Sequence, residues 1–229
     1  MRVAVLSSSP RRDGNSRLLA DAAAEGAAAA GHDVEMIVVA DHVREFLRDC
    51  RRCRGADGTC GIADGFEAAL LGTFLPADAV VFATPVYWYG MSGQLKTFLD
   101  RIFCYIAASY PGADGVVQSL MGKRIALLLS SEESYHGAGA GIQHQIQEYA
   151  RYTHSQYVGT VAGYGNRRGD VRATRPTRWG ARGSSARACS TCAPRTTAST
   201  RSAPGRSGRT PRSPRAPAPR AGSPSGCRR

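Results

Sequence analysis

Residues 2–16 read RVAVLSSSPRRDGNS, and this stretch decides the fold class. The apolar run VAVL is bounded by polar residues, which is typical of a strand buried on both faces of a parallel sheet. The Ala-rich segment that follows has helical spacing, with Asn15 or Ser16 as the expected N-cap and Gly31 where a C-cap belongs. A strand, a polar loop and a helix in this order predict the first unit of an α/β fold.

The same alternation continues along the chain. Further strands are expected at residues 34–39, 79–83, 125–129 and 157–161, and the clearest later helices at 92–110 and 141–153. This order predicts a doubly wound parallel sheet that is covered on both faces and has right-handed crossovers. Ligands of such sheets bind beyond the carboxyl ends of the strands, so the loops after the first, third and fourth strands are the places to examine.

The first of these loops, residues 7–16, has the composition of a phosphate site. It carries four serines, Arg11, Arg12 and Asn15, and it runs into a helix N-terminus, where backbone N–H groups and the helix dipole favour an anion. Gly14 allows a close turn. The loop matches neither GxGxxG nor GxxxxGK[ST], so the sequence supports neither a dinucleotide fingerprint nor a P-loop. The alternative is an ordinary polar turn with a helix cap.

The loop after the third strand gathers aromatic side chains. Residues 83–101 read ATPVYWYGMSGQLKTFLDR, which places Tyr87, Trp88, Tyr89 and Gly90 on a loop rather than in a core. Backbone N–H groups near Gly90 with an adjacent aromatic ring suit a flat heterocycle. The alternative is that these rings cover a dimer interface or the end of the sheet.

Together the two loops resemble those of a known family. SSSPRRDGNS is similar to the phosphate loop, and TPVYWYGMSGQLKTFLDR to the isoalloxazine loop, of the NADPH-dependent FMN reductases, within the flavodoxin-like superfamily that also contains the iron–sulfur flavoproteins. The resemblance covers residues 1 to about 170. It implies a flavodoxin-like five-stranded parallel sheet of order 2-1-3-4-5, whose last helix is missing from this sequence.

The resemblance also implies a cofactor, a reaction and a set of site residues. FMN is the expected cofactor and NAD(P)H the co-substrate, with electrons passing to a flavin, quinone or similar small-molecule acceptor. The flavin carries the chemistry, so no catalytic side chain is expected. The residues expected to hold the phosphate are Ser9, Arg11, Asn15 and Ser16. Those expected to line the flavin ring are Pro85, Val86, Tyr87, Trp88 and Gly90.

A cysteine loop separates the second strand from the third. Cys50, Cys53 and Cys60 have the density of metal ligands, and the loop resembles that of the iron–sulfur flavoproteins, which has a fourth cysteine where this chain has Ala56. A four-iron cluster normally takes four thiolates. Metal-free thiols are the preferred interpretation, and a cluster or a zinc ion held by three Cys and one His are the alternatives.

Charge divides the chain after Asn166. Residues 167–229 hold sixteen Arg and one acidic residue, which gives +15, whereas residues 1–166 hold fourteen basic and seventeen acidic residues, which gives −3. We therefore expect an FMN-binding domain at 1–166 and a disordered Arg/Pro/Ser/Ala-rich tail at 167–229. Its amino-acid composition is the one obtained when GC-rich coding DNA is translated out of frame. We therefore expect a frameshift product from about Val171 or Arg172 onward. A nucleic-acid-binding arm is the alternative.

The remaining expectations concern the whole protein. No apolar run reaches the length of a membrane span and no signal peptide is recognised, so a cytoplasmic location without membrane attachment is expected. The resemblance implies a homo-oligomer. Because the last helix is missing, the chain is expected to fold weakly or to need a partner over the bare face. The alternative functions are a non-enzymatic flavodoxin-like or iron–sulfur electron carrier and, if the tail is genuine, a nucleic-acid-binding protein.

Overall fold

The computed structural model describes residues 1–50, 60–106, 113–172 and 177–179. The chain divides into two units, Met1–Ser190 and Thr191–Arg229, and every described residue belongs to the first. None of the helices described in that unit has both the length and the apolar character that crossing a membrane requires.

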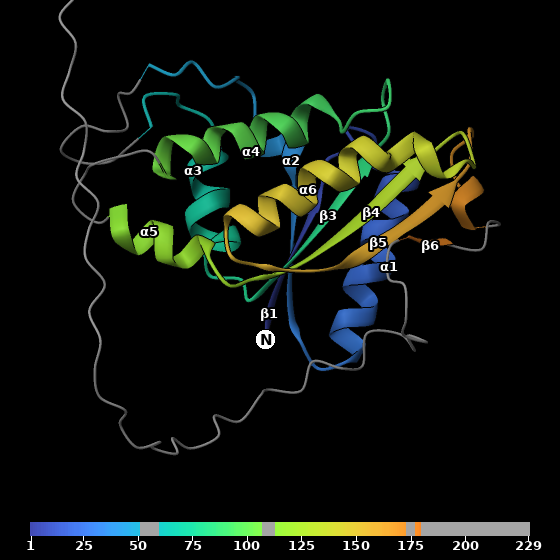
Figure 1. Cartoon of the computed structure of the whole chain (residues 1–229), viewed down its shortest axis with the longest axis horizontal. Helices are drawn as coiled ribbons and strands as arrows, with labels where there is room; N and C mark the ends of the chain where they lie inside the picture. Colours follow the sequence, from blue (N-terminus) through green and yellow to red (C-terminus); the bar gives the residue numbers. More distant parts are fainter. Residues whose placement is uncertain (51–59, 107–112, 173–176, 180–229) are drawn as a thin grey trace, which may run out of the picture. The chain divides into compact units, whose positions relative to one another are not determined.

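One sheet organises the unit, in the strand order β2-β1-β3-β4-β5-β6 (Figure 1). The five parallel strands are β1 (Arg2–Ser7), β2 (Asp33–Val38), β3 (Ala79–Pro85), β4 (Arg124–Ser131) and β5 (Gln156–Tyr164). The predicted parallel order 2-1-3-4-5 is confirmed. The sixth strand, β6 (Thr177–Trp179), was not predicted, because its Arg-rich surroundings show no strand pattern; it pairs antiparallel with β5 at the edge.

Helices connect the strands. The longest are α1 (Asn15–Ala29), α4 (Gly93–Ile106) and α6 (Ala140–Tyr152). The shorter ones are α2 (Val39–His42), α3 (Phe66–Ala69), the π-turn η2 (Leu70–Phe74), α5 (Ala113–Leu120) and the 3₁₀ turns η3 (His136–Gly139) and η4 (Asp170–Arg172). Beyond β5, the described residues form η4 and β6 and contain no longer helix.

The ends of α1 test two of the predicted caps. Gly31, just past the helix, has φ +81°, as expected for a C-terminal glycine. The N-cap prediction is wrong, because Gly14 occupies that position in an extended conformation and Asn15 is already helical. The side chain of Asn15 has partners elsewhere, which explains the difference.

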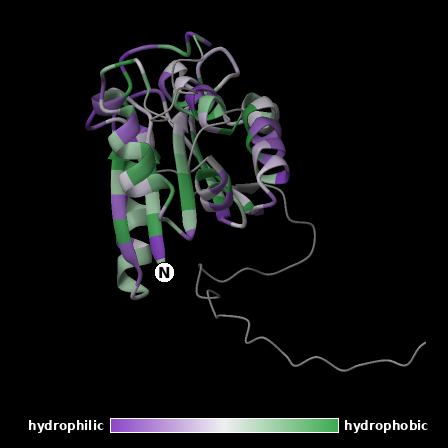
Figure 2. Ribbon diagram, turned by 90° about the vertical axis from the view of Figure 1, so that its left-hand side faces the viewer, coloured by the Kyte–Doolittle hydropathy of each residue, from purple (hydrophilic) through white to green (hydrophobic). Residues whose placement is uncertain are grey.

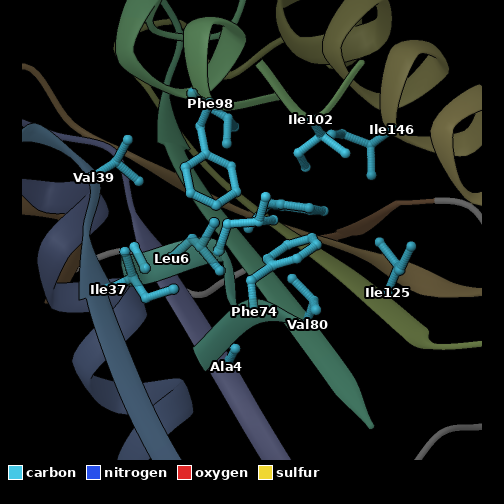
Figure 3. Packing of buried hydrophobic residues seen from close by; sticks show 14 of the residues in the cluster. Ala4, Leu6, Ile37, Val39, Phe74, Val80, Phe98, Ile102, Ile125 and Ile146 are labelled. Atoms are coloured by element: carbon cyan, nitrogen blue, oxygen red, sulfur yellow. The ribbon is translucent and has the colours of Figure 1, made fainter. Parts of the chain in front are cut away.

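The larger core lies on one face of the sheet, between the strands and α2, α3, η2, α4, α5 and α6. Residues of α4 and α6 point toward the strands there (Figure 3). Phe98 of α4 packs at ring-centroid distances of 5.2 Å from Phe66 and 5.4 Å from Phe74. The alternation of hydrophobic and hydrophilic residues along the elements is visible in Figure 2.

The opposite face has a smaller core under α1. Its buried members are Val3, Val5, Ala20, Ala83 and Leu128. Toward the β5 edge, Val161 is half-buried and Val158 is 48% exposed. Among the described elements, α1 is the long helix on this face, so the part of the sheet nearer β5 keeps apolar surface accessible.

Candidate functional site

The carboxyl ends of β1, β3 and β4 meet at one edge of the sheet, where all three candidate loops therefore lie together. A buried serine network joins two of them. Ser8 donates from its Oγ to the Ala83 carbonyl at 3.0 Å, and its Oγ lies 2.9 Å from that of Ser92. The Ser92 N–H donates to Thr84 Oγ1 at 3.0 Å, and the Ser92 Oγ accepts from the Leu95 N–H at 3.3 Å. This network holds the phosphate loop against the aromatic loop, and no motif in the sequence indicated it.

The phosphate loop presents buried hydroxyls with little competition for them. Ser7, Ser9 and Ser16 are all at least 95% buried. The Oγ of Ser7 has no hydrogen-bond partner among the described residues, and that of Ser9 accepts from the Arg11 N–H at 3.2 Å. A buried polar atom without a partner is costly unless a ligand or water satisfies it. The loop therefore has unused hydrogen-bonding capacity where it leaves β1, at the Ser7 hydroxyl.

The N-terminus of α1 opens onto the same loop. No side chain caps it and its first turn contains no acidic residue. The first hydrogen bond back to the N-cap is donated by the Leu18 N–H to the Gly14 carbonyl, so the preceding N–H groups have no partner within the helix. A Cβ on Gly14 would lie 3.2 Å from Ser9 Oγ and 3.3 Å from Arg11 Cβ, so a larger residue would require these side chains to shift by a few tenths of an ångström. The arrangement is that of an anion site.

The charged side chains of the loop divide into paired and free. Arg12 Nη2 donates to both carboxylate oxygens of Asp41, at 2.8 and 2.7 Å, and Asp13 pairs with Arg168 at 2.8 Å. Arg11 is exposed and has no ion pair among the described residues. Of the two loop arginines, Arg11 is therefore the one available to a phosphate.

Asn15 has a different position from the one expected of a phosphate ligand. Its Nδ2 donates to the carbonyls of Gly165 and Arg167, at 3.1 and 3.0 Å, and its Oδ1 accepts from the Gly169 N–H at 2.9 Å. The amide thus fastens the loop after β5 to the start of α1. Only the backbone N–H of Asn15 remains for an anion, and this use of the side chain gave no signal in the sequence.

The aromatic loop forms a tight hairpin turn. Tyr87 and Gly90 exchange two backbone hydrogen bonds of 2.9 Å each, and the Val86 N–H donates to the Ser130 carbonyl. The N–H of Gly90 is thus used within the turn, and it is the N–H groups of Trp88 and Tyr89 that have no partner among the described hydrogen bonds. Pro85 and Val86 lie at the base, at the end of β3, while the side chains of Tyr87, Trp88 and Tyr89 are exposed.

The loop after β4 contributes Glu133 and Tyr135, which the sequence analysis did not select. Tyr89 donates its hydroxyl to Glu133 Oε1 at 3.2 Å, and its ring meets that of Tyr135 edge-on at 6.5 Å. The negative charge of Glu133 raises the pKa of Tyr89, so the phenol stays a donor. These contacts complete a rim around the edge of the sheet.

The cysteine loop is only partly within the described chain. Cys53 and Ala56 lie outside the described residues, Cys50 is exposed and Cys60 is half-buried. Among the described residues, no three His, Cys, Asp or Glu side chains are placed to hold a metal ion. The metal-free interpretation of these cysteines and its alternatives, a cluster or a zinc ion, therefore all stay predictions.

A buried ion pair anchors the end of this loop. Both carboxylate oxygens of Asp64 accept from Arg101, at 2.5 and 2.9 Å, and both side chains are 2% exposed. Burial raises the pKa of Asp64, but hydrogen bonds from Arg101 and from the backbone N–H groups of Arg44 and Phe66 outweigh it and lower the pKa to about 2. The guanidinium also lies 4.2 Å from the Phe66 ring centroid and 3.7 Å from Cys60 Sγ.

Comparison with known proteins identifies the family. A model of the NADPH-dependent FMN reductases matches residues 1–167. The chain belongs to this family. It is therefore an NAD(P)H-dependent oxidoreductase with FMN as its cofactor, as the resemblance implied.

Individual relatives include two flavoproteins and one solved structure. The chain is 28% identical over 171 residues to a putative NAD(P)H-dependent FMN-containing oxidoreductase, YwqN of Bacillus subtilis, covering 75% of this chain and 89% of that protein. It is 36% identical over 101 residues to the iron–sulfur flavoprotein MJ1083 of Methanocaldococcus jannaschii, covering 44% of this chain and about half (51%) of that one. A solved structure of the Trp repressor binding protein from Bacillus subtilis matches at 25% identity with a TM-score of 0.58, over 75% of this chain and 91% of the other.

The residues at the edge of the sheet fit the FMN that the family uses. The uncapped helix and the unpaired Ser7 hydroxyl suit a phosphate, and the free N–H groups of Trp88 and Tyr89 suit a heterocycle that accepts hydrogen bonds. Of the predicted residues, Ser9, Arg11, Val86, Tyr87, Trp88 and Gly90 lie on these loops, Asn15 and Ser16 begin α1, and Pro85 ends β3.

Proposed function

We propose that this FMN reductase holds FMN across the ends of β1 and β3 and transfers electrons from NAD(P)H to a small-molecule acceptor, a flavin or a quinone. The observation that carries the proposal is the buried Ser8–Ser92 contact, which fixes an anion site and an aromatic turn side by side. One of the curated relatives is an FMN-dependent NADH:quinone oxidoreductase from Methylocella silvestris, 38% identical over 84 residues, which are 37% of this chain and 41% of that protein.

In this proposal each group has a distinct task. Ser9, Arg11 and Ser16, with the first N–H groups of α1, bind the phosphate, while Pro85, Val86 and Gly90 shape the base and turn of the ring site. When bound, FMN supplies the chemistry, accepting a hydride and releasing two electrons. The protein side chains orient the reactants, and none is needed as a nucleophile or acid.

Steady-state kinetics tests the reaction. The FMN-loaded protein should oxidise NADPH or NADH in the presence of a quinone or free flavin without any partner reductase. An electron carrier would show no oxidation until a partner was added, and that result would replace the proposed function with the carrier. We also propose that the protein is a homo-oligomer and that it is cytoplasmic. The FMN-binding domain is proposed to end at residue 166, where the Arg-rich tail begins.

Substitutions in the loop test the binding roles. Arg11→Ala and Ser16→Ala should each weaken FMN binding about tenfold, because charge-assisted hydrogen bonds to phosphate are among the stronger polar contacts. Arg12→Ala is the matched control, since Arg12 is paired with Asp41 and should change the FMN dissociation constant less. Equal losses for both arginines would contradict the assignment.

A further inference from the structure

The turn at residues 87–90 has an unusual backbone for its residues. Trp88 and Tyr89 both have positive φ, at 49° and 59°, between the reciprocal hydrogen bonds of Tyr87 and Gly90. Two-residue turns of this kind normally contain Asn and Gly, which tolerate the left-handed region. A bulky aromatic residue there is a genuine outlier. The chain thus keeps two strained residues in succession.

Contacts from the β4 loop hold the strained turn in place. Tyr89 donates to Glu133, and its ring packs edge-on against Tyr135 at 62° between planes. Gly137 leaves room for the Tyr135 ring, since a Cβ at that position would overlap it. Strain of this type persists where surrounding contacts determine the conformation, and it is concentrated at ligand sites.

Burial of Trp88 does not compensate for the strain. Its side chain is 97% exposed, at the tip of the turn, while Pro85 and Val86 below it are buried or half-buried. A large apolar ring held open to solvent by an ordered turn is available to a ligand that approaches from outside the site. The β4 loop adds the negative charge of Glu132 and Glu133 to this rim, and residues 85–92 contain no Lys or Arg.

We propose that the turn displays Trp88 as the stacking surface for an uncharged planar acceptor, a fused-ring quinone, at the entrance to the site. The carboxylate of Glu133, hydrogen-bonded to the neighbouring Tyr89, disfavours an acceptor that brings phosphates to Trp88, such as a free flavin, whereas an uncharged quinone has no such penalty. Aromatic stacking supplies the affinity. The inference rests on the proposed function, which it narrows to quinones, and makes Trp88 a specificity-determining residue for the acceptor rather than an FMN ligand.

The test compares Trp88→Ala, Trp88→Phe and the control Tyr152→Ala. Tyr152 is also an exposed aromatic residue, at the far end of α6 beside the start of β5. For each protein, three quantities are measured: the dissociation constant of FMN, the calorimetric dissociation constant of menadione with the oxidised FMN-loaded protein in the absence of NAD(P)H, and the turnover with menadione or with ferricyanide, an acceptor that does not stack.

Trp88→Ala removes the exposed ring and keeps the backbone N–H, so it should weaken menadione binding and raise its KM about fivefold to tenfold, with the FMN constant and the ferricyanide rate within about twofold of wild type. Trp88→Phe should recover most of the loss, and Tyr152→Ala should change nothing. Parallel weakening of FMN and menadione would overturn the inference, because Trp88 would then be a flavin contact. An unchanged menadione dissociation constant in Trp88→Ala would also overturn it. So would a Trp88→Ala protein that keeps the menadione constant and turnover of wild type and differs only in its oligomeric state, measured by sedimentation.

The same data separate this inference from the proposed function. A wild-type protein that binds FMN and reduces ferricyanide, with menadione unaffected by Trp88→Ala, contradicts the role of Trp88 alone. An FMN-loaded wild-type protein whose menadione constant depends on Trp88, but which oxidises neither NADPH nor NADH, contradicts the proposed function alone. An FMN-loaded protein that oxidises neither nucleotide and whose menadione constant does not depend on Trp88 contradicts both.

Discussion

Trp88 occupies a position where most proteins place asparagine or glycine. Because its side chain makes almost no contact, replacing it removes strain without removing packing. We expect Trp88→Asn to raise the free energy of unfolding of the FMN-free protein by about 0.5–1 kcal/mol, since Asn tolerates the left-handed region. Urea denaturation measures this, with Trp88→Ala as the control that keeps the strain. Equal midpoints for Asn and Ala would show that the turn is not strained.

Asp64 and Arg101 form the most deeply buried ion pair among the described residues. Asp64→Asn should destabilise the protein by about 3–5 kcal/mol, because it leaves the buried Arg101 charge without its counter-charge. Asp21→Asn is the matched control at a surface pair with Arg17, where the cost should stay below about 1 kcal/mol. Similar losses for the two variants in urea denaturation would mean that Arg101 is solvated after the change.

Lys123 is a second buried cation, 5% exposed, whose Nζ donates to the carbonyls of Leu75 and Ala77 at 2.8 and 2.6 Å. Burial lowers its pKa from the usual 10.5 to about 8, against a smaller opposite effect of Asp78. Between these values the unfolded chain binds more protons than the folded one, so stability should rise with pH. We expect a gain of about 1–2 kcal/mol between pH 8 and 9.5.

Urea midpoints across that range measure the effect, and Lys123→Met should abolish it. The range ends below pH 10 because burial raises the pKa of Tyr149. Above that pH the tyrosine ionises in the unfolded chain before it does in the folded one, so stability then falls with pH. A rise of the same size in the Lys123→Met variant would assign the pH dependence to another group.

At the scale of elements, α1 links the phosphate loop to the loop after β5 through Asn15. Asn15→Ala removes three hydrogen bonds and should cost about 1–3 kcal/mol of stability. Ser16→Ala, one residue on, should weaken FMN binding with little effect on the urea midpoint. If Asn15→Ala instead weakened FMN binding and Ser16→Ala instead lowered the urea midpoint, the Asn15 side chain would be the phosphate ligand.

The parallel sheet and the three loops at its edge could be predicted because each strand is a short apolar run followed by a polar or aromatic loop. Asn15 shows where the sequence was insufficient, since its partners Gly165 and Gly169 lie about 150 residues away and contribute backbone atoms only. The same holds for Tyr89 and Glu133, which meet only because β3 and β4 are neighbours. Contacts between loops depend on register, which composition and spacing do not encode.

The C-terminal segment shows a different limit. Val171 was expected to belong to a stretch that builds no core, yet it is 5% exposed and packs over Gly163. One apolar residue suffices there because Gly163 leaves room for it. β6 likewise pairs with β5, a contact that no local sequence pattern indicates.

At the scale of the whole molecule, the two faces of the sheet are unequally covered. A final helix that buried four or five large side chains would contribute roughly 6–15 kcal/mol before entropy, which is comparable to the whole stability of a typical domain. We expect the chain to be weakly stable alone and its unfolding midpoint to rise with protein concentration as a second copy covers the face near Val158.

Calorimetry at several concentrations, with sedimentation at each, tests this expectation. A sharp transition at the same temperature for a monomer at all concentrations would contradict it. The midpoints of the variants above are therefore compared at one protein concentration.

The central claim is that this edge of the sheet binds FMN and that NAD(P)H reduces it there. The most direct test is an anaerobic absorbance spectrum of the FMN-reconstituted protein before and after addition of NADPH, repeated with NADH. The account predicts flavin bands that remain with the protein through gel filtration and bleach on addition of one of the two nucleotides. Loss of all flavin on gel filtration, or bound flavin that neither nucleotide bleaches, would contradict it.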